Sequence, residues 1–180
     1  MQSRPLKILL TGPPGSGKTT AVMNLIAGLD PKNLAGFYTE EIRRRGVRKG
    51  FRWITLDGAS GILAHIDVGR RFKVGKYGVD IAGFEKNVLP VIDPRKSAVQ
   101  LFVIDEIGRM ECLSDKFVTA VRRLFKSDKS VLATVAQKGG GLISEVKNYA
   151  GPELFNLTRH NRDKTIAEII RILSFLTRPL

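Results

Sequence analysis

Short apolar runs alternate with segments of helical hydrophobic spacing along much of this 180-residue chain. Nearly continuous apolar, β-branched runs are typical of strands buried on both faces of a parallel sheet. Apolar residues spaced three and four apart are typical of helices that pack on such a sheet. The predicted core strands are 8–10, 99–104, 131–135 and 154–157, and the predicted helices are 18–27, 84–91, 114–125, 142–149 and one from Asn161. This alternation predicts an α/β fold with a largely parallel sheet and helices on both faces.

A different pattern fills the region between the first helix and the next core unit. Residues 35–42 and 50–56 are predicted strands, and the basic segment 43–49 joins them as a hairpin. Short strand-like pieces continue through 62–66 and 70–81, interrupted by glycines. We therefore predict a single domain over residues 1–180 that carries a β-rich insertion at about 35–82.

The first predicted strand runs directly into Gly12-Pro-Pro-Gly-Ser-Gly17-Lys18-Thr19, which matches the G-x-x-x-x-G-K-[ST] pattern of a phosphate-binding loop. Glycines let backbone N–H groups curve around phosphate oxygens, and the helix dipole that follows favours anions. Lys18 supplies a positive charge for the β- and γ-phosphates, and the Thr19 hydroxyl can bind Mg²⁺. The predicted nucleotide contacts in this loop are Gly12, Pro13, Pro14, Gly15, Ser16, Gly17, Lys18, Thr19 and Thr20.

The apolar run 99–104 leads into a second polar segment, Asp105-Glu106-Ile107-Gly108. An acid at the carboxyl end of such a strand emerges near the phosphate loop, where it can help to hold Mg²⁺. We therefore predict Thr19 and Asp105 as the magnesium-binding residues and Glu106 and Lys18 as the catalytic residues. Glu106 would orient or deprotonate a water molecule. The alternative is that the two carboxylates only cap a strand end. All four residues 105–108 are predicted nucleotide contacts.

Asp105 and Gly108 also fit the D-x-x-G pattern of switch GTPases. The later strands carry no N-K-x-D segment, so the sequence contains no recognisable reader of guanine. The G-x-G-x-x-G pattern of dinucleotide-binding proteins is absent after the first strand as well.

Weaker candidates follow the last two predicted strands. Thr134 and Gln137 stand where a γ-phosphate sensor is usual, although an ordinary strand-end role explains them as well. A loop after the last strand could contact the base or ribose, and we predict Arg162 as a nucleotide contact there. The alternative is an ordinary helix start with Asn161 as its N-cap. The polar residues of this loop are Thr158, Arg159, Asn161 and Arg162.

The hairpin segment 43–52 holds six cations in ten residues, with Phe51 and Trp53 beside them. Three hypotheses fit this cluster: a solvated hairpin tip, a nucleic-acid contact through charge and aromatic stacking, and an arginine finger. Its cations are Arg43, Arg44, Arg45, Arg48, Lys49 and Arg52.

Composition adds charge and compartment to this picture. Lysine and arginine total 30 against 17 acids, a net charge of +13 that favours polyanionic partners. No apolar run approaches the roughly 20 residues needed to cross a bilayer, and no signal peptide is visible, so we predict a cytoplasmic protein without membrane contact. Cys112 is the only cysteine, which excludes an intrachain disulfide. We expect it to be packed and unreactive.

Several of these segments together resemble one family, the nucleoside-triphosphatases of the THEP1 type. They are 12–20, 36–41 (GFYTEE), 74–80 (VGKYGVD) and 103–111 (VIDEIGRME), with Thr158, Asn161 and Arg162. The phosphate loop alone is generic, whereas GFYTEE followed by VIDEIGRME is specific. The resemblance implies a RecA-like P-loop NTPase fold. It also implies Mg²⁺-dependent release of the γ-phosphate from ATP, GTP, CTP, TTP and UTP, with weaker action on diphosphates.

Two other functions stay open on the residues alone. A nucleotide or small-molecule kinase shares the loop and this chain length, and it would need an acceptor pocket. A nucleic-acid-associated ATP switch would use the basic hairpin and show salt-sensitive binding of RNA or DNA. Nucleoside triphosphates are the predicted ligands in every case, and no oligomeric state is predicted.

Overall fold

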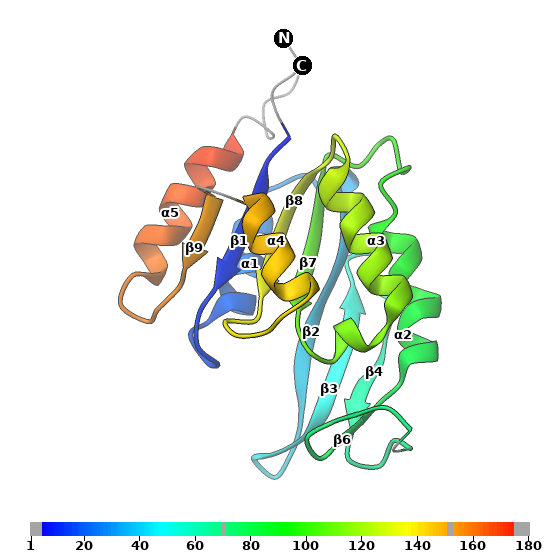
Figure 1. Ribbon diagram of the computed structural model, residues 1–180. Helices are drawn as coiled ribbons and strands as arrows, with labels where there is room; N and C mark the ends of the chain where they lie inside the picture. Colours follow the sequence, from blue (N-terminus) through cyan, green and yellow to red (C-terminus); the bar gives the residue numbers. More distant parts are fainter. Residues whose placement is uncertain (1–4, 70, 151–152, 175–180) are drawn as a thin grey trace.

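The computed structural model describes residues 5–69, 71–150 and 153–174. One nine-stranded sheet in the order β5-β6-β4-β3-β2-β7-β8-β1-β9 forms its centre (Figure 1). The strands are β1 (Lys7–Thr11), β2 (Leu34–Arg44), β3 (Val47–Thr55), β4 (Ser60–His65), β5 (Lys73–Val74), β6 (Tyr77–Val79), β7 (Leu101–Ile107), β8 (Ser130–Val135) and β9 (Leu154–Asn156). The helices are α1 (Lys18–Ile26), α2 (Ile81–Val88), α3 (Asp115–Lys126), α4 (Leu142–Ala150) and α5 (Arg162–Leu173), with 3₁₀ turns η1 (Pro31–Asn33), η2 (Leu89–Ile92) and η3 (Glu111–Leu113).

The predicted α/β fold is confirmed in the half of the sheet that runs from β2 through β7, β8 and β1 to β9, where all neighbours are parallel. Side chains alternate between two hydrophobic clusters with the period of two that a strand imposes. Ile8 and Leu10 pack with α1 and α5, whereas Leu9 between them packs with the cluster on the opposite face. The strands are therefore buried on both faces, which explains their continuous apolar runs.

Helices cover both faces of this parallel half (Figure 1). Helices α1 and α5 lie on one face, and α2, α3 and α4 lie on the other. A cluster of phenylalanines joins α2 and α3 to β2: the ring of Phe37 lies 5.6 Å from Phe84 and 6.1 Å from Phe117. Among the described residues, no helix combines the length and the apolar character that crossing a membrane requires.

The predicted β-rich insertion extends the same sheet. The first residues of β2 pair with β7, and its remaining residues pair with the antiparallel strand β3. Strands β4, β6 and β5 continue in antiparallel pairs, and we call β3 to β6 the antiparallel extension. In Figure 1 it projects past the helices at the end of the sheet where β1 and β7 end.

Trp53 is part of the core, because only 4% of its surface is exposed. Its ring packs across Gly61 of β4, where a Cβ atom would lie 2.4 Å from the indole. The hypothesis that Phe51 and Trp53 together stack on nucleic acid is therefore wrong for Trp53.

Two predicted element boundaries are also wrong. Strand β7 continues through Asp105 and Glu106 to Ile107, so the acids lie within the strand and not after it. Helix α2 begins at Ile81, because the side chain of Asp80 accepts a hydrogen bond from the Gly83 N–H and caps the helix. That cap ends the predicted strand-like segment 70–81 before Ile81. Residue 70 itself lies outside the described residues.

Candidate active site

The loop between β1 and α1 is held against the end of β9. The Leu157 N–H donates to the Thr11 carbonyl at 2.7 Å, so the chain after β9 runs beside the loop. Gly12 has φ +150°, and a Cβ atom there would lie only 2.2 Å from the Leu157 carbonyl oxygen. Gly17 has the left-handed conformation at the N-cap of α1. Glycine is therefore required at both positions for backbone reasons, whatever ligand the loop binds.

The acid that ends the apolar part of β7 lies behind the loop. Asp105 is fully buried, and its carboxylate accepts a 2.7 Å hydrogen bond from the Thr19 hydroxyl and another from the Thr134 hydroxyl. Burial raises the pKa of Asp105, while Thr134, Thr19 and the charge of Lys18 lower it. Thr134 has no exposed surface, so the structure places it behind Asp105 and not in the position of a γ-phosphate sensor.

We expect Thr134→Val to lower the free energy of unfolding by about 1–3 kcal/mol, because a buried carboxylate oxygen loses its donor while the side-chain shape is kept. Denaturant unfolding of the nucleotide-free protein measures the change. Thr165→Val is the matched control, since Thr165 is also buried but lies on α5 away from any carboxylate in the described hydrogen bonds. Equal losses in the two variants would contradict the assigned role of Thr134.

Glu106 faces the loop from the neighbouring position on β7. The pairing of β7 with β8 shifts register between Ile104 and Ile107, which interrupts the regular alternation at the two acids. The carboxylate of Glu106 lies 3.8 Å from the ammonium group of Lys18, and 32% of its side chain is exposed. Lys18 also donates to the Gly12 carbonyl at 3.3 Å. Burial raises the pKa of Glu106 and Asp105 adds to this, whereas Lys18 lowers it.

A cleft of about 750 Å³ opens over these groups, and its lining comes from two directions. One side is the phosphate loop with the start of α1, and the other is β2 with the antiparallel extension. The predicted site residues that line it are Gly12, Pro14, Gly15, Gly17, Lys18, Thr19, Thr20, Glu106, Gly108 and Gln137.

Some predicted residues lie outside this lining. Ile107 has no exposed surface and packs in the core, so its side chain does not reach the cleft. Pro13 is exposed, whereas the Ser16 and Thr11 hydroxyls are buried and have no hydrogen-bond partner among the described residues. Arg162 lies against the loop, because a Cβ atom on Gly17 would be 3.4 Å from its Cδ.

The loop after β9 is organised by Asn161, although not as predicted. Its side chain accepts from the Thr158 N–H at 2.8 Å and donates to the Asn156 carbonyl at 2.9 Å. The residue stands at the N-cap position of α5, but its side chain makes no capping hydrogen bond to the helix. The predicted N-cap function is therefore wrong. The side chain closes the loop that carries Arg159 and Arg162.

Of the six hairpin cations, only Arg48 is among the described residues that line the cleft, a position compatible with the arginine-finger hypothesis. Arg48 lines the cleft, stacks at 5.3 Å over the ring of Phe51 and donates to Glu41 at 2.6 Å. The GFYTEE segment could have indicated this part of the cleft, because its Thr39, Glu40 and Glu41 all line it. From the sequence alone, polar residues at the end of a strand are usually assigned to the solvent-exposed surface. Besides Arg48 and Phe51, which were candidates for other roles, the lining residues that were not predicted as site residues are Thr39, Glu40, Glu41, Leu63, Val74, Arg109, Met110, Glu111, Ala136 and Lys138.

Glu111 is a buried carboxyl group at the edge of the cleft. It accepts a hydrogen bond from the Gly108 N–H at 3.1 Å, and 5% of its surface is exposed. Burial raises the pKa of Glu111 to about 8, and the neighbouring acids Glu106 and Asp105 contribute. The folded protein therefore keeps this proton between about pH 4.5 and 8, while the unfolded chain loses it. The protonated Glu111 therefore makes its full contribution to the free energy of unfolding below pH 4.5. That contribution is lost as the pH rises through 8.

As the pH rises from 5 to 8, the free energy of unfolding should fall less for Glu111→Gln than for the wild type. We expect the two decreases to differ by about 1–3 kcal/mol. Glutamine stays neutral and can still accept from the Gly108 N–H, so the hydrogen bond is retained. Denaturant unfolding without nucleotide or divalent metal tests this, with exposed Glu168→Gln as control. Parallel pH profiles for Glu111→Gln and the wild type would contradict the assignment.

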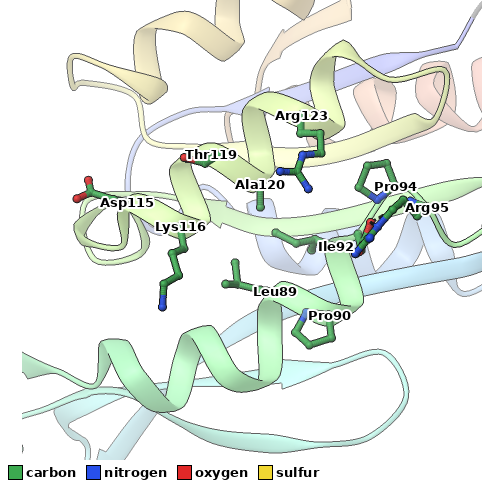
Figure 2. Close-up of a pocket in the computed structure, with 11 residues that line it drawn as sticks. Leu89, Pro90, Ile92, Pro94, Arg95, Asp115, Lys116, Thr119, Ala120 and Arg123 are labelled. Carbon is green, nitrogen blue, oxygen red and sulfur yellow. Dashed lines mark hydrogen bonds and ion pairs between the residues drawn. The ribbon is translucent and has the colours of Figure 1, made fainter.

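A second cavity, of about 580 Å³, lies between η2 and α3 (Figure 2). Leu89, Pro90 and Ile92 form one wall, while Lys116 and Arg123 project from α3 on the other. None of the predicted site residues lines it. It is therefore a useful reference surface for variants in the first cleft.

The oxygen atoms around Asp105 fit a hard divalent cation. Within the described ranges, no group of three or more His, Cys, Asp and Glu side chains is placed to hold a metal ion. However, Mg²⁺ is commonly held by one or two protein oxygens, with phosphates and water completing its octahedron. The Thr19 hydroxyl and the Asp105 carboxylate lie 2.7 Å apart at the edge of the loop, which fits such a site.

Cys112 packs beside the core, and burial raises the pKa of its thiol to about 12. The thiolate is therefore disfavoured, as expected for an unreactive cysteine.

Comparison with known proteins connects this geometry to one family. A family model described as NTPase matches residues 7–170. The nucleoside-triphosphatase THEP1 of Thermotoga petrophila is 41% identical over 170 residues, covering 94% of each chain. The crystal structure of THEP1 from Aquifex aeolicus superposes with a TM-score of 0.84 at 36% identity, covering 96% of this chain and all of that one.

A solution structure of a human cancer-related nucleoside triphosphatase has a TM-score of 0.77 at 33% identity, and the match covers 97% of this chain and all of that one. Relatives from bacteria and human thus share both the sequence and the fold. The resemblance inferred from the motifs is confirmed, and the chain belongs to the NTPase family that includes THEP1.

Proposed function

We propose that this protein hydrolyses the bond to the γ-phosphate of nucleoside triphosphates. The observation that carries the proposal is the position of Glu106. Its partly exposed carboxylate faces the cleft beside Lys18, next to the buried pair of Asp105 and Thr19. The names of the related proteins, which are nucleoside-triphosphatases, support the same reaction.

The phosphate chain lies on the loop from Gly12 to Thr20 in this proposal. Backbone N–H groups and the N-terminus of α1 contact its oxygens, and Lys18 neutralises charge on the terminal phosphates. Thr19 and Asp105 would hold Mg²⁺, which, when bound, neutralises charge shared by the β- and γ-phosphates. Thr134 keeps the Asp105 carboxylate in place from behind.

Glu106 acts on the water molecule. Its carboxylate orients a water toward the γ-phosphorus and accepts a proton as the new P–O bond forms. The exposed fraction of its side chain, 32%, leaves room for that water at the cleft surface. Lys18 lies 3.8 Å from the same carboxylate, close enough to the loop to contact the terminal phosphates.

The proposed substrates are ATP, GTP, CTP, TTP and UTP, with weaker action on diphosphates, as the family resemblance implies. The sequence contains no N-K-x-D segment, which would select for guanine. Its absence supports a broad specificity for the base of the nucleotide. Assay of the purified protein with each of the five triphosphates, with Mg²⁺ or with EDTA, tests both points. Phosphate release from all five that EDTA abolishes is expected, and turnover of GTP alone would contradict it.

The nucleic-acid switch makes a different prediction for the same assay. It requires RNA or DNA to stimulate phosphate release in a salt-dependent way. Two observations support hydrolysis over the switch: Trp53 is buried, and Arg43, Arg48 and Arg52 form ion pairs with Glu41 and Glu40. We therefore expect no stimulation by RNA at moderate salt.

A further inference from the structure

The cleft is divided by the order of strands in the sheet. The acids of β7 lie between the phosphate loop, which follows β1, and the antiparallel extension, which begins beyond β2. The lining therefore has a loop side and an extension side, with Glu106 between them. We call the second part the extension subsite, and its residues are Glu41, Arg48, Phe51, Leu63 and Val74.

In the proposed function, the phosphate chain and the nucleoside occupy the loop side of the cleft. Thr19 and Asp105, which lie 2.7 Å apart beside β7, are the proposed holders of the terminal phosphates through Mg²⁺, so in that proposal the phosphate chain ends facing β7. On the opposite side of the loop, Arg159 and Arg162 lie 3.9 Å and 3.4 Å from where Cβ atoms on Gly15 and Gly17 would be. Neither arginine lines the cleft itself, and in the proposed function they contact the phosphates and nucleoside from the side of β9. The extension subsite thus lies beyond the γ-phosphate.

Planar groups line this subsite. The Arg48 guanidinium stacks over Phe51, and Phe51 meets Tyr77 edge-to-face at 5.5 Å. Arg48 is fixed in place, because it donates to Glu41 at 2.6 Å and to the Tyr77 hydroxyl at 3.3 Å. Leu63 and Val74 add apolar surface. A flat, partly apolar ligand fits such walls better than an aliphatic polyol does.

The two charged side chains of the subsite pair with each other. Glu41 and Arg48 lie 2.6 Å apart, and Arg43, which does not line the cleft, also binds Glu41. Among the five described residues of the subsite, no charged side chain lacks a partner, and an uncharged ligand avoids the cost of separating Glu41 from Arg48.

From these observations we propose that the extension subsite binds a phosphoryl acceptor, an uncharged planar molecule with an alcohol group, of which a nucleoside is the simplest example. The inference rests on the proposed function, because it uses the same γ-phosphate and the same Glu106. The protein is then a phosphotransferase that hydrolyses its donor when water occupies the acceptor position.

The alcohol oxygen of the acceptor forms a bond to the γ-phosphorus, and the bond from this phosphorus to the oxygen bridging the β-phosphate breaks. The nucleoside diphosphate leaves with that electron pair, and the Glu106 carboxylate accepts the hydroxyl proton. The products are a nucleoside diphosphate and the phosphorylated acceptor.

The test is incubation with Mg²⁺ and ATP labelled in the γ-phosphate, with and without millimolar nucleosides, followed by separation of the labelled products. We expect label to appear on the nucleoside while the release of free phosphate falls. Ribose and glycerol should accept at least tenfold less label, and nucleoside monophosphates likewise. Preferred transfer to a polyol or to a monophosphate would overturn the acceptor class.

Two pairs of variants localise the effect. Phe51 and Phe72 both lie under an arginine, at 5.3 Å and 5.4 Å, but only Phe51 lines the cleft. Arg48 and Arg52 both bind a glutamate of β2 at 2.6 Å, but only Arg48 lines the cleft. We expect Phe51→Leu and Arg48→Ala to lower the ratio of transfer to release at least tenfold. Phe72→Leu, Arg52→Ala and Thr119→Leu in the second cavity should keep the ratio of the wild type.

The outcomes separate this inference from the proposed function. Release of phosphate from ATP with no labelled acceptor overturns the inference and leaves the hydrolase intact. No loss of ATP under any condition overturns both. If Phe51→Leu raises the KM for ATP without acceptor as much as it impairs transfer, the subsite holds the donor base, and the inference is wrong.

Discussion

Glu106→Gln is expected to lower the release of phosphate from nucleoside triphosphates by about 10²–10⁴-fold. Glutamine keeps the size of the side chain but cannot accept a proton from water. Nucleotide binding should stay within a few fold of the wild type, since the loop, Lys18 and the Asp105–Thr19 pair are unchanged. Single-turnover hydrolysis, together with titration of a fluorescent nucleotide, separates the two effects.

Glu145→Gln is the matched control for that experiment. Glu145 also forms an ion pair with a cation, Arg122, but it lies on α4 away from the cleft. Its replacement should leave phosphate release unchanged. Near-normal release by Glu106→Gln would show that another group orients the water, and the assignment of Glu106 would then be wrong.

Lys18→Ala is expected to impair both steps. Binding should weaken by about 10–100-fold, because a charge-assisted contact to phosphate is lost. Turnover should fall by a further 10²–10³-fold, because charge that develops on the terminal phosphate is no longer neutralised. The same pair of assays measures both changes. The variant also leaves Glu106 without its 3.8 Å partner.

Lys86→Ala provides the comparison, since Lys86 is an exposed lysine on α2. It should bind and hydrolyse nucleotide like the wild type. A Lys18→Ala protein that loses turnover but binds with unchanged affinity would place Lys18 solely in the chemical step.

The parallel half of the fold follows directly from sequence because its signals are local. Ile8, Leu9 and Leu10 are all apolar, which a strand requires only when both of its faces are buried. The phosphate loop can also be predicted from the sequence, because Gly12 and Gly17 have backbone conformations that few other residues adopt. Local constraints of this kind produce residue types at fixed spacings along the sequence, which a motif can detect.

The rest of the site depends on contacts between distant segments. Trp53 has a neighbourhood rich in arginine, yet its ring is buried because Gly61 on the next strand leaves space for it. The Asn161 side chain forms hydrogen bonds with Thr158 and Asn156. It therefore does not cap α5, although asparagine is a common N-cap residue. Whether Arg48 faces solvent or substrate depends on how far β2 extends past β7, which no local pattern encodes.

The contact of Gly12 with Leu157 has a consequence for the order of events during synthesis. The loop directly follows the first strand, but the residue that packs against it, Leu157, comes after β9 near the other end of the sequence. A nascent chain therefore carries its phosphate-binding motif for most of translation without the wall that shapes it. The contact between the loop and Leu157 can therefore form only after β9 has been synthesised.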